Sequence, residues 1–212
     1  MQEHSTGPSF DSNVCPENTH LGAFDDNVAH SVGRYGLRIF SNMLPRQQPC
    51  MPYSDTNTPV TATFNNFQAY KCGRNGAIAE RVAAIEFVDF KVADNLVAGA
   101  EMSLTDDLPE GYTKISGGLF VGKSENTEPA LEQSSPRGVI TPRSEGFTLE
   151  NAKFYNYNFN EAAGLGDCSH CFHASSTDSG ARTYSVRGLH FDDDTTPRRI
   201  RYQPPQRGIF HD

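Results

Sequence analysis

Short apolar runs separated by turn residues dominate the chain, and helical periodicity is sparse. The clearest pattern is a small or apolar residue, any residue, an apolar residue, any residue, and then Asp or Asn. Alternation with a period of two places the first residue and the central apolar residue on one face of a strand, and the Asx residue that follows favours a turn. The pattern occurs as Gly22-x-Phe24-x-Asp26, Ala62-x-Phe64-x-Asn66, Ile85-x-Phe87-x-Asp89, Ala152-x-Phe154-x-Asn156 and Leu189-x-Phe191-x-Asp193.

The spacing of these copies predicts a repeating fold. Successive Phe residues are 40, 23, 67 and 37 residues apart, and the longest interval contains a weaker copy, Leu119-x-Val121. Such irregular intervals are typical of a solenoid with loops of variable length. Stacked strands lie about 4.8 Å apart, so we predict that the five Phe side chains form one interior column. The Phe-rich strands of a β-sandwich give the same pattern, so the repeat alone leaves both architectures open.

Other local signals also favour an all-β chain. The Ala-rich segment 76–85 fits either a helix or a strand that runs into Ile85. Two polar, Pro-rich stretches, 45–59 and 124–142, predict long loops. Glycines between the apolar runs indicate turns; they are Gly33, Gly36, Gly73, Gly76, Gly99, Gly111, Gly117, Gly118, Gly164, Gly166, Gly180 and Gly188.

Composition narrows the class of protein. The chain has 212 residues, 36% of them apolar, which suits one domain or a segment of a larger protein. The net charge of −8 argues against nucleic-acid binding, which needs clustered cations. No signal peptide or transmembrane stretch is visible in the chain. Because both ends look cut, we expect residues 1–212 to be a single segment of a larger ectodomain.

Several motifs in order resemble one known family. The segment Phe24-Asp-Asp-Asn27-Val-Ala29-His30-Ser31-Val-Gly33-Arg34-Tyr-Gly36-Leu37-Arg38-Ile39 is similar to a hallmark stretch of the fibrocystin and fibrocystin-like proteins. Its Asn-x-Ala-His-Ser core is also similar to that of the cell-migration-inducing hyaluronan-binding proteins and their transmembrane relatives. The further matches are Phe64-Asn-Asn66, Val92-Ala93-Asp94-Asn95-x-x-Ala98-Gly99, Cys168-Ser-His-Cys171 and Ile200-x-Tyr202-x-x-Pro205-x-x-Gly208-Ile209-Phe210.

The resemblance covers about residues 7–212 and implies a right-handed parallel β-helix with long loops. It implies an extracellular or cell-surface scaffold of receptor type that presents loops to a protein or glycan partner and needs no cofactor. The expected partners exclude nucleic acid, and a membrane is expected only through parts missing from this chain. The alternative is an extracellular hydrolase of a hyaluronan-like glycan, or a hyaluronan-binding module without turnover. The negative net charge weakens the binding module unless basic residues cluster locally.

The five cysteines are disulfide candidates, as expected in a secreted protein: Cys15, Cys50, Cys72, Cys168 and Cys171. Their pairing cannot be deduced from spacing, and their odd number leaves one unpaired within the chain. A zinc site formed by Cys168, Cys171, His170 and His173 is an alternative, although no second Cys-x-x-Cys or His-x-x-x-His motif accompanies it. Free thiols are a third reading.

The remaining candidates are polar residues near the strand ends. His30 could serve as a general base and Asp94 as a catalytic carboxylate, but the sequence has no nucleophile motif and does not assemble a convincing catalytic set. The structural alternative places Asn27 in a ladder of stacked Asn side chains, with Ala29 packed inward. Asp192 and Asp194 could ligate Ca²⁺, although their spacing is not that of a calcium loop.

Overall fold

The computed structural model describes residues 11, 13–40, 42–104, 113–126, 136–142, 146–159, 162–166 and 184–201. The strands of this part form three parallel sheets. Sheet A contains β3 (Ala62–Asn65), β6 (Ile85–Val88), β9 (Thr113–Ser116), β12 (Phe147–Glu150) and β15 (Ser185–Arg187). Sheet B contains β1 (Val28–His30), β4 (Gln68–Tyr70), β7 (Lys91–Ala93), β10 (Leu119–Val121), β13 (Lys153–Tyr155) and β16 (His190–Phe191). Sheet C contains β2 (Leu37–Ile39), β5 (Asn75–Val82), β8 (Ala98–Leu104), β11 (Arg137–Ile140), β14 (Ala163–Gly166) and β17 (Ile200–Arg201).

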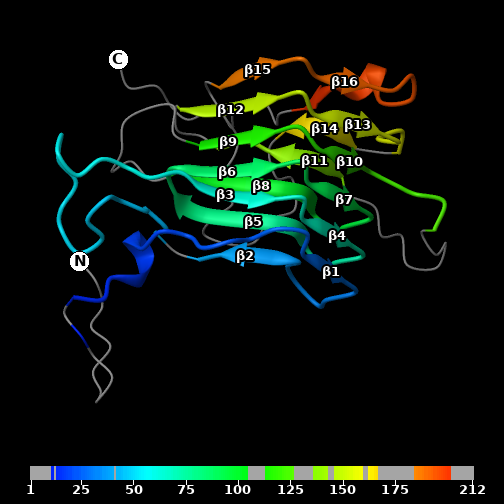
Figure 1. Ribbon diagram of the computed structural model, residues 1–212. Coiled ribbons are helices and arrows are strands. Elements are labelled where there is room, and N and C mark those ends of the chain that lie inside the picture. The colour runs from blue at the N-terminus through cyan, green and yellow to red at the C-terminus, as the bar shows by residue number, and fades with distance from the viewer. Residues whose placement is uncertain are drawn as a thin grey trace, which may run out of the picture.

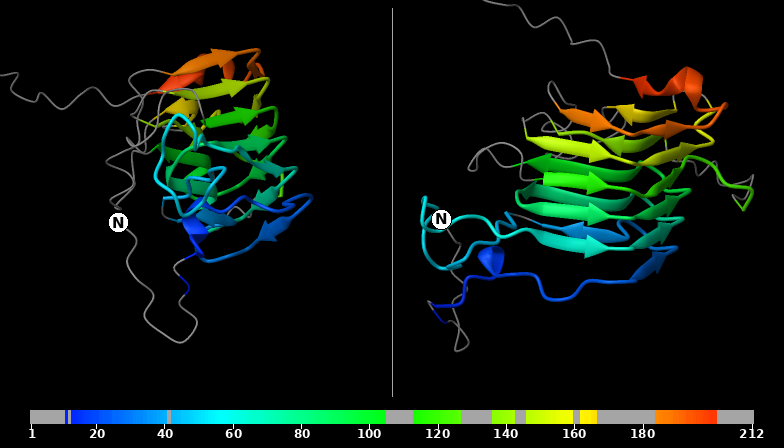
Figure 2. Two further views of the ribbon diagram at one scale, coloured as in Figure 1. Left: turned by 60° about the vertical axis from the view of Figure 1, so that its left-hand side comes forward. Right: turned by 45° about the horizontal axis from the view of Figure 1, so that its top comes forward.

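The chain passes through sheets A, B and C in turn and then begins again one level higher. Strands β3, β4 and β5 form one such rung, and β6, β7 and β8 pair with them as the next rung. Figure 1 shows the rungs stacked from blue to orange, and Figure 2 shows the parallel strands one above another. The fold is therefore a parallel β-helix, as the family resemblance implies, and not a sandwich. The helical elements of the described residues are the short 3₁₀ turns η1 (Pro16–Asn18) and η3 (Thr196–Arg198).

The Asp and Asn residues of the repeat form the corners. At the corner between sheets A and B, the backbone of Asn66, Asp89 and Asn151 is left-handed, with φ of 46°, 51° and 54°. Gly117 and Gly188 occupy the equivalent position in the other rungs, with φ of 72° and 62°. Asp, Asn and Gly tolerate this conformation better than other residues. Of the Asx residues that the repeat places at strand ends, Asp26, Asn66, Asp89 and Asn156 have a left-handed backbone, and Asp193 lies in a turn, so the predicted turns are confirmed.

The predicted single Phe column is wrong, because the repeat occupies two different corners. Phe24, Phe64 and Phe87 line the inside of sheet A, where the ring centroids of Phe64 and Phe87 lie 5.7 Å apart. Phe154 and Phe191 belong to sheet B, where their rings stack at 5.0 Å. At the corner after sheet B, Ser31, Lys71, Asp94 and Asn156 are also left-handed. The same local motif therefore arises at both corners.

The weak copy at residues 119–121 also has a different register from the one predicted. Phe120 is fully buried and stacks on Phe154 at 5.2 Å. Leu119 and Val121 are half-buried and lie on the outer side of β10. Strand alternation therefore turns Leu119 and Val121 outward, whereas the repeat pattern placed them inside.

Several glycines that indicated turns form a column within sheet C instead. An added Cβ would lie 2.7 Å from the next glycine's carbonyl oxygen at both Gly76 and Gly99. The same Cβ would lie 2.9 Å from the Phe120 ring at Gly99 and 2.7 Å from the Phe154 ring at Gly138. The aromatic column of sheet B therefore packs against sheet C backbone that has no side chain. The column consists of Gly36, Gly76, Gly99, Gly138 and Gly164.

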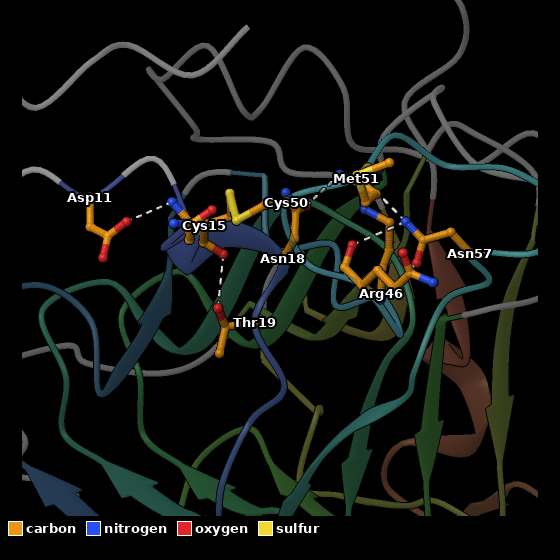
Figure 3. The surroundings of a disulfide bond; sticks show 10 residues. Asp11, Cys15, Asn18, Thr19, Arg46, Cys50, Met51 and Asn57 are labelled. Atoms are coloured by element: carbon orange, nitrogen blue, oxygen red, sulfur yellow. Dashed lines mark hydrogen bonds between the residues drawn. A yellow bond between two sulfur atoms is a disulfide. The ribbon is translucent and has the colours of Figure 1, made fainter.

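The two predicted loops differ in the structure. Residues 45–59 contain only isolated bridges, and the Cys15–Cys50 disulfide fastens them to the segment around η1, with a Cα–Cα distance of 5.3 Å (Figure 3). Inside this loop, the Asn57 side chain donates to the carbonyl oxygens of Met51 and Pro52. The second predicted loop, 124–142, extends too far, because residues 137–140 form β11. Gly138, Val139 and Ile140 are buried, and this apolar run overrides the flanking prolines.

The segment 76–85, which fitted a helix or a strand, contains most of β5 and the start of β6. Nearly every residue of β5 is buried, so both sides of this strand are covered. β-Branched and Ala side chains at these positions suit a strand without an exposed face better than an amphipathic helix.

Candidate functional site

The outer faces of the three sheets differ in what they offer to a ligand. In sheet C, both alternating sets of residues in β5 and β8 are buried. In sheet A, the outer side chains form ion pairs with one another. In sheet B, the outer side chains of the four central strands border open space. The candidate site is therefore built on sheet B.

The ion pairs of sheet A form a ladder across four strands. Glu86, Lys114, Glu150 and Arg187 occupy outer positions in successive strands, and Lys114 Nζ lies 3.4 Å from Glu86 Oε1. Lys114 and Arg187 both pair with Glu150, whose side chain is almost fully buried. Ser116 Oγ also donates to Glu150, at 3.2 Å. Glu86 faces Lys114 and Glu150 faces Arg187 directly, whereas Lys114 and Glu150 are diagonal neighbours. Opposite charges within reach on neighbouring strands stabilise a sheet, so this face has a structural explanation.

This ladder predicts acid sensitivity. The hydrogen bond from Lys114, with a further one from Arg187, holds the pKa of Glu150 below its ordinary value of 4.5. A carboxyl whose folded pKa is lowered contributes stability that is complete above its unfolded pKa and disappears as pH falls through the folded pKa. We therefore expect the free energy of unfolding to fall below about pH 4.5, and to fall less in Glu150→Gln.

Urea denaturation at a series of pH values measures this difference. Glu86→Gln is the matched control, because its contact with Lys114 is longer than that of Glu150 and its side chain is more exposed. A pH profile of Glu150→Gln that parallels the wild-type profile contradicts the assignment.

The outer residues of sheet B form two columns along the solenoid axis. In the first, Gln68, Lys91, Leu119, Lys153 and His190 lie in register on neighbouring strands. In the second column the register is His30, Tyr70, Ala93, Val121 and Tyr155. The first column thus has one apolar side chain, Leu119, among polar ones, and the second places small side chains between two tyrosines.

These columns form a groove, here called the sheet-B groove. One part of it, about 1040 Å³ in volume, extends from the corner residues of sheet A to β13, and an adjoining part of about 630 Å³ covers β4 to β10. The smaller volume is within the range of about 300–1,000 Å³ that is usual for small-molecule sites, and the larger volume is at the upper end of that range. Besides the outer residues of β4, β7, β10 and β13, the groove is bordered by Asn66, Asp89, Gly117 and Asn151 on one side and by Lys71, Asp94, Ser124 and Asn156 on the other.

The charge of the groove is opposite to that of the chain. Of the chain's five lysines, Lys71, Lys91 and Lys153 line it, against two carboxylates, Asp89 and Asp94. Three positive and two negative charges give a local charge of +1, whereas the whole chain has −8. This is the local basic clustering that composition alone could not reveal.

Polar contacts fix some of these side chains. Lys91 Nζ donates to Asn66 Oδ1 at 2.8 Å, so the ammonium group is held beside the corner. The Asp94 carboxylate accepts from the Ser124 backbone N–H at 2.7 Å and from Ser124 Oγ at 2.5 Å. Asp94 is also buried, at 2% exposure. Its carboxylate therefore holds the border of the groove in place.

Aromatic rings lie at both ends of the second column. The His30 and Tyr70 rings stack at 5.0 Å with an interplanar angle of 7°. At the other end, the Tyr155 ring lies 5.7 Å from that of His190. Tyr70 is 39% exposed, and Tyr155 is half-buried. Tyr70 and Tyr155 thus lie on either side of a stretch of the groove floor that is formed by the smaller side chains of Ala93 and Val121.

The structure places the two catalytic candidates on different rungs. His30 is exposed on β1, whereas Asp94 follows β7, and β4 lies between these strands. Two strand spacings correspond to about 10 Å, so a direct hydrogen bond between them is not available in this arrangement. Ala29 packs against the core as expected. The corner ladder, however, begins one residue before Asn27: Asn66 Nδ2 donates to Asp26 Oδ1 at 2.5 Å.

The candidate calcium ligands, Asp192 and Asp194, accept hydrogen bonds at the turn that follows β16. Asp192 accepts from the backbone N–H groups of Asn156 and Thr195, at 2.9 and 2.7 Å. Asp194 accepts from the Asn158 side chain at 3.1 Å. Within the described ranges, no group of three or more His, Cys, Asp or Glu could hold a metal ion. The zinc candidates Cys168, His170, Cys171 and His173 lie outside the described residues.

The five disulfide candidates have different outcomes in the structure. Cys15 and Cys50 form a disulfide, and Cys72 has a free, fully buried thiol. Burial raises the pKa of Cys72 to about 11, so the thiol is protonated at neutral pH and unreactive. Cys168 and Cys171 lie outside the described part of the chain.

Fold and site together define a parallel β-helix with an open, locally basic groove along one sheet. No family model matches the sequence. The chain is 31% identical to mouse fibrocystin-L and 30% identical to human fibrocystin-L, in each case over 173 residues, or 78% of the chain. It is 27% identical to dog fibrocystin over 199 residues, or 91% of the chain. The chain belongs to the fibrocystin-like family, and it spans about 4% of the length of these relatives.

Helices long and apolar enough to cross a bilayer do not occur in the described part of the chain.

Proposed function

We propose that this β-helix is a non-catalytic, receptor-type segment of an extracellular or cell-surface protein, and that the sheet-B groove binds a saccharide chain of its partner. The observation that carries the proposal is the pair of columns on the outer face of sheet B, with lysines in one and tyrosines in the other. A few polar groups beside apolar and aromatic surface are the usual composition of a small-ligand site.

A saccharide fits this surface better than a peptide strand does. Peptides that add to a sheet need an exposed strand edge, whereas β4, β7, β10 and β13 each have a paired strand on both sides. A sugar ring needs no such edge, because its C–H face packs on an aromatic face while its hydroxyl groups bond to polar side chains. Tyr70 and Tyr155 offer the aromatic faces, and Gln68 and Asn156 offer amide groups at the same surface.

The extracellular setting is supported by the Cys15–Cys50 disulfide, since such bonds persist in oxidising compartments. The non-catalytic role is supported by the positions of the catalytic candidates. Asp94 is buried and bonded to Ser124, and His30 lies two strands away from it.

The proposal predicts that Tyr155→Ala weakens saccharide binding by about fivefold to tenfold, or about 1–1.4 kcal/mol. Isothermal titration of the purified chain with defined hexasaccharides measures this, using a neutral N-acetylglucosamine chain and an alternating uronate–N-acetylhexosamine chain. The matched control is Tyr53→Ala, because Tyr53 is 37% exposed but lies in the 45–59 loop, away from the groove. Failure of every saccharide to bind contradicts the proposal, as does an equal effect of both variants.

The same mixtures also test for turnover. We expect the saccharides to keep their length on incubation with the chain, as measured by size-exclusion chromatography. If the wild type shortens the saccharides and Asp94→Asn or His30→Ala abolishes that shortening, the segment is a hydrolase and the scaffold role is contradicted.

A further inference from the structure

The first strand of sheet C, β2, has a free edge, at the lower end of the stack in Figure 1. Among the described strands, β2 pairs with β5 alone. In a parallel pair, alternate residues of a strand direct their backbone N–H and C=O groups toward the neighbouring strand. The Gly36 N–H donates to the Asn75 carbonyl oxygen and so points toward β5. The backbone groups of Leu37 and Ile39 therefore point toward the free edge, to which an extended peptide can add.

Aromatic and basic side chains lie beside this edge, on the outer face of sheet C. The Arg38 guanidinium carbon lies 4.1 Å from the Phe40 ring centroid and 5.1 Å from that of Tyr35. Arg38 Nε also donates to Glu80 Oε2 at 2.7 Å, so three groups hold the guanidinium in place. Because this bond uses Nε, the two terminal amino groups of Arg38 can bind a second carboxylate. Phe40 is 67% exposed, so much of its ring is open to a partner.

The surroundings of Arg38 are basic, in contrast to the chain as a whole. Arg34 is exposed between β1 and β2, and Arg74 Nη1 donates to the Tyr35 hydroxyl at 3.5 Å. Neither Arg34 nor Arg74 forms an ion pair with a described residue. The three arginines and Glu80 give a local charge of +2, from three positive charges and one negative charge, whereas the whole chain has −8.

An acidic strand fits this edge better than a second copy of β2 does. Two copies joined at β2 would bring Arg34 and Arg38 of both copies to one interface, and like charges on facing strands destabilise a sheet. The next carboxylate of the outer face, Glu101, lies two strands from Arg38 and is bonded to Asn75. A second carboxylate for Arg38 is therefore best supplied by the added strand.

We infer that the free edge of β2 binds an extended, acidic segment of a protein partner as an additional strand of sheet C. The partner's backbone bonds to that of Leu37 and Ile39. Because side chains alternate along a strand, a carboxylate of the partner faces Arg38 and an aromatic side chain two residues away faces Phe40. Apolar residues between them face inward and cover Leu37, which is half-buried against the core. This surface is separate from the sheet-B groove.

The test measures binding of a fluorescent, capped heptapeptide, Thr-Val-Glu-Val-Phe-Val-Thr, to the purified chain by fluorescence anisotropy. We expect affinity to fall by at least about fivefold when Gln replaces the Glu of this peptide. Two further peptides are N-methylated, one at the odd and one at the even residues. Since an added strand pairs through one of its two edges, one methylated peptide is expected to lose at least about tenfold in affinity and the other to keep it.

Variants of the chain locate the site. Arg38→Gln is expected to weaken the Glu peptide by at least about fivefold and to leave the Gln peptide unchanged. Because Arg38 also bonds to Glu80, Arg34→Gln provides a second variant at a side chain without an ion pair, with an expected loss of about threefold. Arg199→Gln is the matched control, since Arg199 is exposed beside β17, at the other end of sheet C. Far-UV circular dichroism confirms that each variant keeps the β-helix.

Several results would overturn the inference. One is equal binding of the Glu and Gln peptides; another is an equal effect of the two N-methylation patterns, which excludes strand pairing. Equal effects of Arg34→Gln and Arg199→Gln place the peptide elsewhere on the chain. A dimer in sedimentation velocity that the peptide fails to dissociate, and that Arg38→Gln strengthens, assigns the edge to a second copy instead.

Discussion

Replacing Phe154 by alanine is expected to lower the free energy of unfolding by about 3–5 kcal/mol. The Phe154 ring is fully buried between Phe120 and Phe191, with centroid distances of 5.2 and 5.0 Å. It also packs on the backbone of Gly138, which has no side chain to fill a space. Removal of the ring therefore leaves a cavity in the middle of the solenoid that its neighbours cannot close.

Urea denaturation followed by far-UV circular dichroism measures this loss. Phe40→Ala is the matched control, since Phe40 is 67% exposed and its contact is the Arg38 guanidinium, 4.1 Å from the ring centroid. Loss of that cation–π contact costs at most about 1 kcal/mol. Similar losses in the two variants would show that Phe154 is not part of a packed interior column.

Adding a single methyl group to the glycine column is expected to be almost as damaging. In Gly138→Ala the new Cβ would lie 2.6 Å from the Gly164 carbonyl oxygen and 2.7 Å from two carbons of the Phe154 ring. The carbonyl belongs to a paired strand and cannot move without disturbing the sheet. Overpacking of this kind costs about 1–3 kcal/mol, and the backbone contact places Gly138→Ala at the upper end.

Gly33→Ala is the control for this prediction, because a Cβ at Gly33 would have no atom within 4 Å. We expect its urea midpoint to stay within error of the wild-type value, whereas that of Gly138→Ala falls. If Gly138→Ala proves as stable as the wild type, the close packing of the sheet B rings on sheet C is contradicted.

The sequence supports the architecture for a physical reason that lies in its corners. Left-handed turns favour Asp, Asn and Gly, so Asn66, Asp89 and Asn151 mark the strand ends even without a regular period. Because the same turn preference applies at more than one corner, the sequence does not show which sheet a given strand belongs to. Phe64 and Phe154 show one local motif but precede different corners, and nothing local distinguishes the corner after sheet A from the corner after sheet B.

The glycine column and the sheet-B groove could not be predicted from the sequence, because both depend on residues that come from different rungs. Gly99 is equally compatible with a turn and with a strand beneath an aromatic ring, and the choice depends on Phe120, which comes from the next rung. Likewise, it is the register of the rungs, and not their separation in the sequence, that places Lys91 and Lys153 in one outer column, on either side of Leu119. A search for outward positions in the second strand of each rung would have found them, once the register was known.

The most direct test of the sheet-B groove is a map of the residues that respond to a saccharide. Two-dimensional amide NMR spectra of the labelled chain, recorded during titration with the hexasaccharide that binds most tightly in the calorimetric test, supply that map. We expect the largest shift changes in β4, β7, β10 and β13 and at the corner residues Asn66 and Asn156, with none in the ion-pair ladder of sheet A. Changes confined to sheet A or to the 45–59 loop, or no changes at all, would contradict the account.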